Sequence, residues 1–253
     1  MAKAQETVLE VNLSALEHNY VYLKSKLQKK TKFLAVVKAF GYGSDAAIIS
    51  QKLQQLKVDY FAVAYTSEGV ALRKAGIIAP IIVFHPQIVN FKTIINHCLE
   101  PSLYSFKVLK AFQKAAKEFS QIDYPVHVKF NTGLNRLGFN DTNLEEVIST
   151  IKATSFIKVK SVFSHLAASE DFKEVLFTKN QIASFKIIVD TFIKGIGYKP
   201  IIHLCNTSGI LNYPEAHFDM VRCGIGLYGF GNSKQEHQAY TQARKRINDS
   251  RHT

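Results

Sequence analysis

Short apolar runs alternate with amphipathic segments along most of the chain. The run at residues 33–37, Phe-Leu-Ala-Val-Val, is continuously apolar, which is typical of a strand buried on both faces of a parallel sheet. Residues 13–27 instead carry apolar side chains at helical spacing, with Ser14 as the expected N-cap. We expect strands at residues 33–37, 60–64, 81–84, 101–104, 126–130, 159–163, 201–205 and 220–222. We expect helices at residues 13–27, 45–56, 67–75, 88–97, 108–119, 144–153 and 178–194, with Gly76 and Gly195 ending the third and the last of them.

This alternation of strands with helices predicts an α/β protein and favours a (β/α)8 TIM-type barrel. An open doubly wound sheet would give a similar pattern and remains the alternative. The chain has 253 residues, which suits one barrel of about 250 residues or two small domains.

The two ends of the chain do not follow the alternation. Residues 8–11 predict a further strand before the first helix, outside the count of eight. Residues 232–253 contain few large apolar side chains and several basic ones, so we expect them to be disordered. The expected organisation is therefore a leading strand within residues 1–11, a barrel at 12–231 and a tail at 232–253.

Composition narrows the function classes. The net charge of +12 motivates a nucleic-acid-binding alternative, but the lysines are scattered and form no dense basic run. No apolar run reaches about 18 residues, and residues 1–6 lack the apolar core of a signal peptide. The three cysteines have no CxxC spacing, so we expect neither a disulfide framework nor a metal site. We therefore expect a cytoplasmic protein that binds no membrane.

Lys38 is the first candidate for chemistry, because it directly follows the first predicted strand. The carboxyl ends of barrel strands build the active site, and a partly desolvated lysine there can act as nucleophile or base. Gly41 and Gly43 flank Tyr42, which predicts a tight turn that brings backbone and phenol close to a ligand.

Four further segments with candidate polar residues lie at or after the ends of later predicted strands. They are Asn-Thr-Gly-Leu-Asn-Arg-Leu-Gly at residues 131–138, Ser-His-Leu-Ala-Ala-Ser-Glu-Asp at 164–171, His-Leu-Cys-Asn-Thr-Ser-Gly at 203–209, and Asp-Met-Val-Arg-Cys-Gly-Ile-Gly-Leu-Tyr-Gly at 219–229. A guanidinium fork binds carboxylates well, and hydroxyl and backbone N–H groups at a helix start are natural phosphate ligands. Arg136 and the pair Asn206-Thr207 therefore carry groups that suit an anionic ligand.

Together the five segments resemble the motifs of alanine racemases, pyridoxal-phosphate enzymes of fold type III. The stretch AVVKAFGYGSD at residues 35–45 resembles AVVKANAYGHG, and the segment at 219–229 resembles D-x-V-R-x-G-I-x-L-Y-G. Asn131 stands where the family usually has Asp, and Thr207 where it usually has Ser. The resemblance covers about residues 8–230 and implies the N-terminal barrel of such an enzyme.

The resemblance also implies roles for individual residues. Lys38 would form the Schiff base with pyridoxal phosphate, and Arg136 would bind the cofactor's phenolic oxygen and the substrate's carboxylate. His165 would lie beside the pyridine ring. Lys129 matches a position that is carbamylated in some members, although an ordinary charged lysine remains the alternative. Contacts on the phosphate side would come from Tyr42, Asn206, Thr207, Gly224 and Ile225.

Arg222 would face the pyridine nitrogen, with His203 accepting a hydrogen bond from it. Arginine keeps its proton, so the ring should stay largely neutral and be a weaker electron sink. That choice favours returning a proton to the α-carbon over transamination. The implied function is the interconversion of L-alanine and D-alanine for cell-wall peptidoglycan.

In the family, a second base comes from a tyrosine on a β-rich domain of the partner subunit in a homodimer. Residues 232–253 do not resemble that domain, and Tyr240 is left without a role. We therefore expect a truncated or frameshifted product with impaired activity, and an unpaired strand at residues 8–11. The alternatives are a single-barrel pyridoxal-phosphate carrier, which would lack the signature after Arg222, and a racemase for another amino acid.

Overall fold

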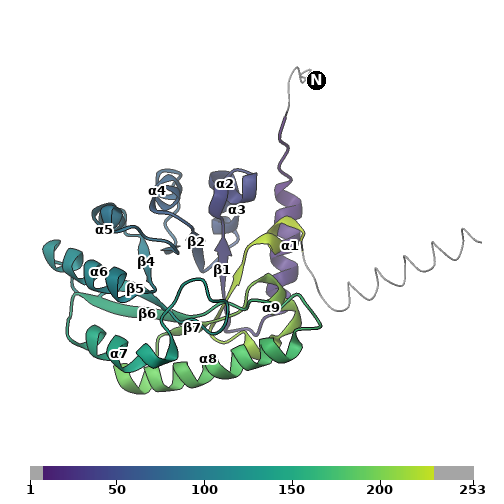
Figure 1. Cartoon of the computed structure of the whole chain (residues 1–253). Coiled ribbons are helices and arrows are strands. Elements are labelled where there is room, and N and C mark those ends of the chain that lie inside the picture. The colour runs from purple at the N-terminus through teal and green to yellow at the C-terminus, as the bar shows by residue number, and fades with distance from the viewer. Residues whose placement is uncertain (1–7, 231–253) are drawn as a thin grey trace, which may run out of the picture.

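Eight parallel strands close into a barrel in the computed structural model, which describes residues 8–230 (Figure 1). Closure is made by β1 and β8, where Phe33 pairs with Val221 and Ala35 with Cys223. The predicted TIM-type barrel is thus confirmed, and the open-sheet alternative is wrong. The strands are β1 (Lys32–Val36), β2 (Tyr60–Val63), β3 (Ile81–Val83), β4 (Glu100–Leu103), β5 (Tyr124–Lys129), β6 (Ile157–Phe163), β7 (Ile201–His203) and β8 (Met220–Cys223).

Helices surround the strands on the outside of the barrel (Figure 1). They are α1 (Leu13–Ser25), α2 (Lys38–Gly43), α3 (Ala46–Gln55), α4 (Thr66–Lys74), α5 (Phe91–Asn96), α6 (Phe106–Glu118), α7 (Leu144–Lys152), α8 (Val175–Ile196) and α9 (Thr207–Asn212). Short 3-10 turns lie at η1 (Ile88–Asn90), η2 (Asp141–Asn143), η3 (Pro214–Ala216) and η4 (Ile225–Tyr228). The sequence pattern did not predict α2 or α9, which are each only six residues long.

Several predicted helix ends differ from the structure by one to three residues, and at two of them a predicted cap is wrong. Asn12, not Ser14, caps α1, because its side chain accepts a hydrogen bond from the Ala15 backbone N–H at 2.9 Å. Helix α8 continues through Gly195 and ends at Gly197, whose φ of 82° is the left-handed conformation that favours glycine at a helix end.

Alternating side chains divide each strand between two cores. Outward residues such as Phe33 and Val221 join the large core between the barrel and the helices. A small apolar cluster fills part of the barrel interior and includes Leu34, Tyr60 and Met220. On β5 to β8 the alternate positions are polar yet buried: His127, Lys129, Ser161, His203 and Arg222. The barrel interior is therefore lined by polar side chains on the side formed by β5 to β8 and by mainly apolar side chains on the other side.

The predicted leading segment pairs with no strand of the described chain, as expected for an unpaired strand. Residues 8–12 adopt neither helix nor strand, and the side chains of Val8 and Leu9 are exposed. A strand needs a neighbour to pair its backbone groups, and residues 8–11 pair with no strand in the described chain. The predicted disordered tail at residues 232–253 and the first seven residues lie outside the described part of the chain.

We expect Gly138→Ala to be strongly destabilising. Gly138 has a φ of +135°, and an added Cβ would lie 2.6 Å from the backbone nitrogen of Asn131. Backbone strain and overlap together should lower the free energy of unfolding by roughly 3–5 kcal/mol, measured by urea denaturation. Gly76→Ala is the matched control, because Gly76 also has positive φ but open space around it, and it should cost only about 1–2 kcal/mol. Equal losses in both variants would contradict the steric explanation.

Candidate active site

A left-handed turn of backbone follows β1 and carries Lys38 at its start. Ala39, Phe40, Gly41 and Tyr42 have φ values from 53° to 64° with positive ψ. Each non-glycine residue in this conformation costs about 1–2 kcal/mol. Such a turn persists only where the surrounding structure determines it, and strained backbone of this kind is concentrated at functional sites.

The Glu68 carboxylate holds this turn against the next strand. Its Oε1 accepts a hydrogen bond from the Ala39 backbone N–H at 2.6 Å. Its Oε2 accepts from the N–H groups of Ala64 and Tyr65, at 2.7 and 2.9 Å, which lie where β2 leads into α4. One side chain therefore fixes the backbone beside Lys38 to the end of β2.

A cavity of about 420 Å³ opens at the carboxyl ends of the strands, next to this turn. Its lining includes ten of the eleven residues assigned from the sequence; His203 lies behind the wall, fully buried. The assigned lining residues are Lys38, Tyr42, Lys129, Arg136, His165, Asn206, Thr207, Arg222, Gly224 and Ile225. The structure thus brings together residues that are almost 190 positions apart in the sequence.

Three polar lining residues were not assigned from the sequence: His85, Glu170 and Ser208. His85 follows β3 as Lys38 follows β1, so its position after a strand was the available signal. Glu170 and Ser208 lie inside segments already singled out. Roles were given to other residues of these segments, His165 in the first and Asn206 and Thr207 in the second.

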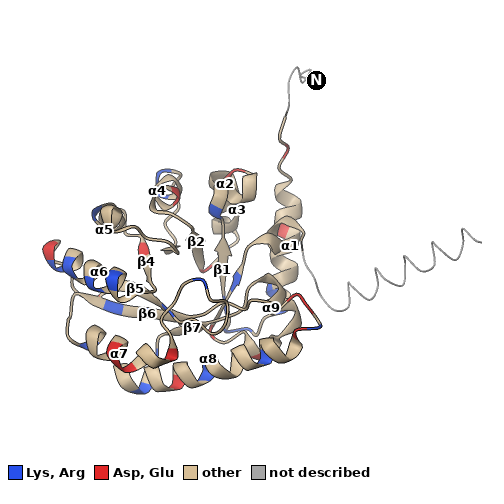
Figure 2. Cartoon of the chain, viewed as in Figure 1, with Lys and Arg blue, Asp and Glu red and all other residues tan. Residues whose placement is uncertain are grey.

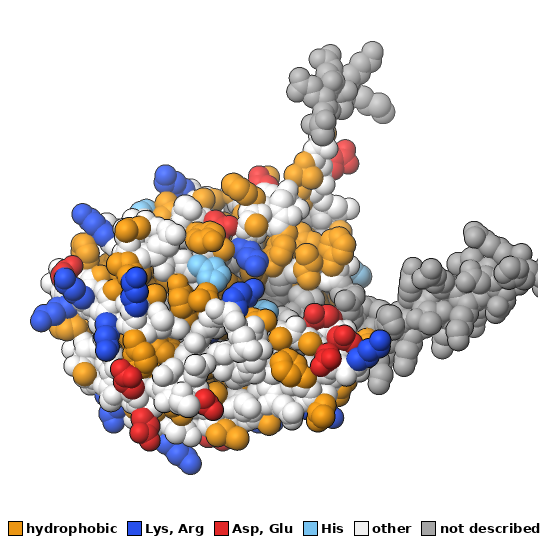
Figure 3. Space-filling model, in the orientation of Figure 1, with side chains coloured by type: hydrophobic (Ala, Val, Ile, Leu, Met, Phe, Trp, Pro, Cys, Tyr) orange, Lys and Arg blue, Asp and Glu red, His pale blue; other side chains and the backbone are white. Residues whose placement is uncertain are grey.

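The cavity is strongly cationic. Lys38, Lys129, Arg136 and Arg222 line it, and Glu170 is the one carboxylate among the described lining residues. Figure 3 shows His, Lys and Arg side chains gathered near the middle of the face drawn. An excess of positive charge of this kind suits a ligand with more than one anionic group.

The surrounding charges also change the ionisation of the site's basic groups. Burial, followed by the charges of Arg222, Lys129, Arg136 and Lys38, lowers the pKa of His165 well below its usual value. Burial and the two nearby guanidinium groups lower the pKa of Lys129 to about 8. His165 is therefore neutral at physiological pH, and the Lys129 amine is partly deprotonated near that pH.

Arg222 is buried in the barrel and donates only to neutral groups. Its Nη1 contacts His203 Nδ1 at 2.9 Å. Its Nη2 donates to the carbonyl oxygens of Ser164 and Leu204, at 2.7 and 2.8 Å, and contacts His165 Nδ1 at 3.1 Å. Burial lowers the pKa of Arg222 to about 10, so the guanidinium stays charged at neutral pH.

Segments at α9 and η4 form another wall of the cavity, where side-chain oxygens accept hydrogen bonds from backbone N–H groups. Asn206 caps α9 by accepting from the Gly209 N–H at 2.9 Å. Thr207 Oγ1 accepts from the N–H groups of Gly224 and Gly226, at 3.3 and 3.2 Å. These contacts tie the segment after β7 to the segment after β8.

Tyr42 closes this wall from the other side. A Cβ on Gly224 would overlap the Tyr42 hydroxyl, so glycine is needed for the phenol to reach the backbone here. The Tyr42 ring packs against Tyr228 with ring centroids 5.1 Å apart. Burial raises the pKa of Tyr42 to about 12, so the phenol is a hydrogen-bond donor at neutral pH.

The loop after β5 presents Arg136 to the cavity. Asn131 organises this loop, because its Oδ1 accepts from the backbone N–H groups of Gly133 and Asn135, at 3.2 and 3.0 Å. The replacement of the family's usual Asp by Asn therefore retains an acceptor for the loop backbone. Arg136 itself is exposed at the mouth of the cavity.

Residues 11–231 match the sequence model of the family described as alanine racemase, N-terminal domain. This chain belongs to the alanine racemase family. Alanine racemase 1 of Oceanobacillus iheyensis is 35% identical over 226 residues, covering 87% of this chain and 59% of the relative. The alanine racemase of Thermodesulfovibrio yellowstonii is 36% identical over 225 residues, covering 88% and 60%.

Solved structures agree with this assignment of an alanine racemase barrel. Alanine racemase of Clostridium difficile 630 superposes with a TM-score of 0.83 at 30% identity, over 88% of this chain and 58% of that one. The alanine racemase of Bartonella henselae, solved with covalently bound pyridoxal phosphate, superposes with a TM-score of 0.78 at 26% identity, over 87% and 62%. This chain therefore spans about three fifths of the length of the curated relatives it matches.

The lowered pKa of Lys129 predicts a pH-dependent stability. Between about pH 8 and the usual lysine value of 10.5, the unfolded state binds this proton and the folded state does not. The free energy of unfolding should therefore rise with pH across that window, relative to a Lys129→Met variant that cannot titrate. Urea denaturation of both proteins at several pH values measures the difference. A difference that stays constant, or falls, from pH 8 to 10.5 would show that the amine is not desolvated.

Proposed function

We propose that this chain binds pyridoxal phosphate through Lys38 and acts on alanine as a racemase. The observation that carries the proposal is the cationic cavity at the barrel mouth, which Lys38 lines. A phosphate and a substrate carboxylate would balance the charge of the four cations that line it. The side-chain-free backbone at Gly224, with the Tyr42 phenol against it, is a cradle suited to a phosphate.

The residues present fit the cofactor group by group. Lys38 would hold the aldehyde, while Tyr42, Asn206, Thr207 and the backbone of Gly224 and Ile225 would hold the phosphate. Arg222 would face the ring nitrogen. The covalent pyridoxal phosphate in the Bartonella henselae enzyme supports this proposal by similarity.

Pyridoxal phosphate, when bound, withdraws electrons from the substrate's α-carbon. Arg222 donates hydrogen bonds but keeps its proton, since its pKa stays near 10. The guanidinium would therefore limit how much charge the ring of a bound cofactor takes up, which would favour return of the proton to the α-carbon. Lys38 Nζ would remove and return that proton on one face, and Arg136 would orient the substrate by its carboxylate.

Alanine as substrate, a homodimer and a cytoplasmic location are part of the same proposal. Among the described residues, no helix is long and apolar enough to cross a membrane. In the family a tyrosine of the partner's second domain serves the opposite face of the α-carbon. We therefore propose that the 253 residues expressed alone carry only the Lys38 half of the proton transfer.

Two alternative functions are less well supported. A single-barrel cofactor carrier would lack the signature at residues 222–229, and the racemase relatives align over most of the chain. A nucleic-acid-binding protein would present a continuous basic surface. Figure 2 instead shows Lys and Arg interspersed with Asp and Glu over several helices.

Covalent labelling tests the cofactor site. Protein incubated with pyridoxal phosphate and reduced with borohydride should carry the added mass on the peptide that contains Lys38. Lys38→Arg should abolish the label. Lys129→Met is the matched control, because it removes the neighbouring cavity amine but leaves Lys38. Label on another lysine, with none on Lys38, would refute the proposed function.

Exchange in deuterated water tests the proton transfer. The 253 residues expressed alone should exchange the α-proton of one alanine enantiomer, seen by NMR, faster than they convert it to the other. Loss of one positioned acid or base costs about 10²–10⁴-fold in rate, so racemisation should lag behind exchange by that order. Equal rates of exchange and racemisation would contradict the single-base expectation.

A further inference from the structure

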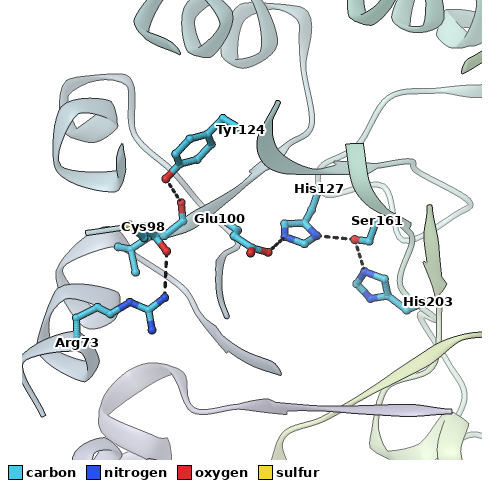
Figure 4. A network of polar contacts seen from close by, with 8 residues as sticks. Arg73, Cys98, Glu100, Tyr124, His127, Ser161 and His203 are labelled. Atoms are coloured by element: carbon cyan, nitrogen blue, oxygen red, sulfur yellow. Dashed lines mark hydrogen bonds and ion pairs between the residues drawn. The ribbon is translucent and has the colours of Figure 1, made fainter. Parts of the chain in front are cut away.

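A line of polar side chains, most of them buried, crosses the barrel interior (Figure 4). Glu100 Oε2 lies 2.7 Å from His127 Nε2, and His127 Nδ1 lies 2.6 Å from Ser161 Oγ. Ser161 Oγ is 2.8 Å from His203 Nε2, and His203 Nδ1 is 2.9 Å from Arg222 Nη1. The line joins the buried guanidinium to a carboxylate through three intervening side chains.

The three middle members of this line are enclosed by the protein. His127, Ser161 and His203 are fully buried, and His127 pairs with Ser161 across β5 and β6 at a bulge in the register. Each hydrogen bond is short. Because water does not reach these atoms, each donor and acceptor must be matched within the line itself.

The far end of the line is also anchored. Arg73 donates to the Cys98 carbonyl at 3.0 Å, and the Tyr124 hydroxyl donates to the Leu99 carbonyl at 2.8 Å (Figure 4). These bonds fix the backbone that leads into Glu100. The carboxylate is therefore presented to the barrel interior from a fixed position.

The guanidinium of Arg222 determines which atom donates and which accepts in each hydrogen bond of the line. A guanidinium only donates, so His203 Nδ1 must carry a lone pair. His203 then bears its proton on Nε2 and donates to Ser161. Because Ser161 has one hydroxyl proton and accepts from His203, it donates to His127 Nδ1.

The Glu100 end is consistent with the same direction. An ionised carboxylate only accepts, so His127 must bear a proton on Nε2. With its ring neutral, His127 Nδ1 accepts from Ser161, whose oxygen accepts from His203 Nε2. With a strict donor at one end and a strict acceptor at the other, one arrangement gives every buried donor in the line an acceptor, and in it both rings are neutral.

We propose that Glu100, His127 and Ser161 are positioning residues for Arg222, acting through the tautomer of His203. They hold His203 in its Nε2–H form, so that its Nδ1 lone pair receives the guanidinium. The opposite tautomer would place an N–H group against Arg222 at 2.9 Å and would turn the guanidinium away. The role of Arg222 toward a cofactor ring rests on the proposed function, whereas the tautomer assignment does not.

The first test uses the protein without cofactor and ¹⁵N-labelled histidine. NMR at pH 7 should show His127 and His203 both neutral and both protonated at Nε2. A proton on Nδ1 of either ring, or a doubly protonated ring, would overturn the proposal. Glu100→Gln keeps an acceptor oxygen and should retain the hydrogen-bonded Nε2–H signal of His127, whereas Glu100→Met, of similar size, should lose it.

The second test removes the Arg222 end. In Arg222→Met, His203 should still be the Nε2–H form, because Glu100 continues to direct the line through Ser161. The double variants Arg222→Met with Ser161→Ala, or with Glu100→Met, should show a mixture of the two His203 tautomers, because no partner then selects between them. A mixture of His203 tautomers in the Arg222→Met single variant would refute the claim that Glu100 controls the tautomer of His203. If Arg222→Met does not fold, the wild-type and Glu100 spectra decide the question.

A third measurement connects the line to the site. Glu100→Met should weaken pyridoxal phosphate binding by about three- to tenfold, the equivalent of one lost hydrogen bond, while Glu100→Gln should stay within about twofold. Equal affinities for the Met and Gln variants would count against a positioning role. Failure of Lys38 labelling with the expected tautomers would refute only the proposed function. Wrong tautomers with successful labelling would refute only this inference.

Discussion

A donor-only cation buried in the barrel interior sets requirements that extend across the structure. Arg222 is only 3% exposed, and burying a guanidinium is costly unless each N–H group finds an acceptor. The acceptors are carbonyl oxygens of Ser164 and Leu204, where β6 and β7 end, and two imidazole nitrogens. The ends of neighbouring strands must therefore keep their relative positions, and both histidines must stay neutral.

The closed parallel barrel satisfies these requirements because its register is fixed all the way round. A shift of one residue would exchange inward and outward side chains on a strand, so Arg222 would enter the apolar layer under the helices. The outward neighbours Val221 and Cys223 are fully buried in that layer and oppose such a shift. Apolar packing outside the barrel thereby holds the polar line inside it in place.

The sequence predicted the strands well because an apolar run buried on both faces is a local signal. It also predicted which positions follow the strands, and these include nearly all the residues that line the cavity. It could not predict the links between segments far apart in the chain. Glu68 reads as an ordinary surface residue until its contact with Ala39 is seen. His127 and Ser161 were expected in strands, but their pairing depends on the barrel's register.

The unpaired segment at residues 8–11 and the unforeseen α2 turn follow from the same physical point. An apolar run specifies a strand only when another strand supplies the missing hydrogen bonds, and none does so for Val8 in the described chain. The left-handed turn is the reverse case, where local preference opposes the observed backbone at Phe40. Tertiary contacts decide both outcomes. Glu68 binds the turn from one side and the Tyr42 phenol packs onto Gly224 from the other, so the strained backbone beside Lys38 is stable only once the barrel has closed.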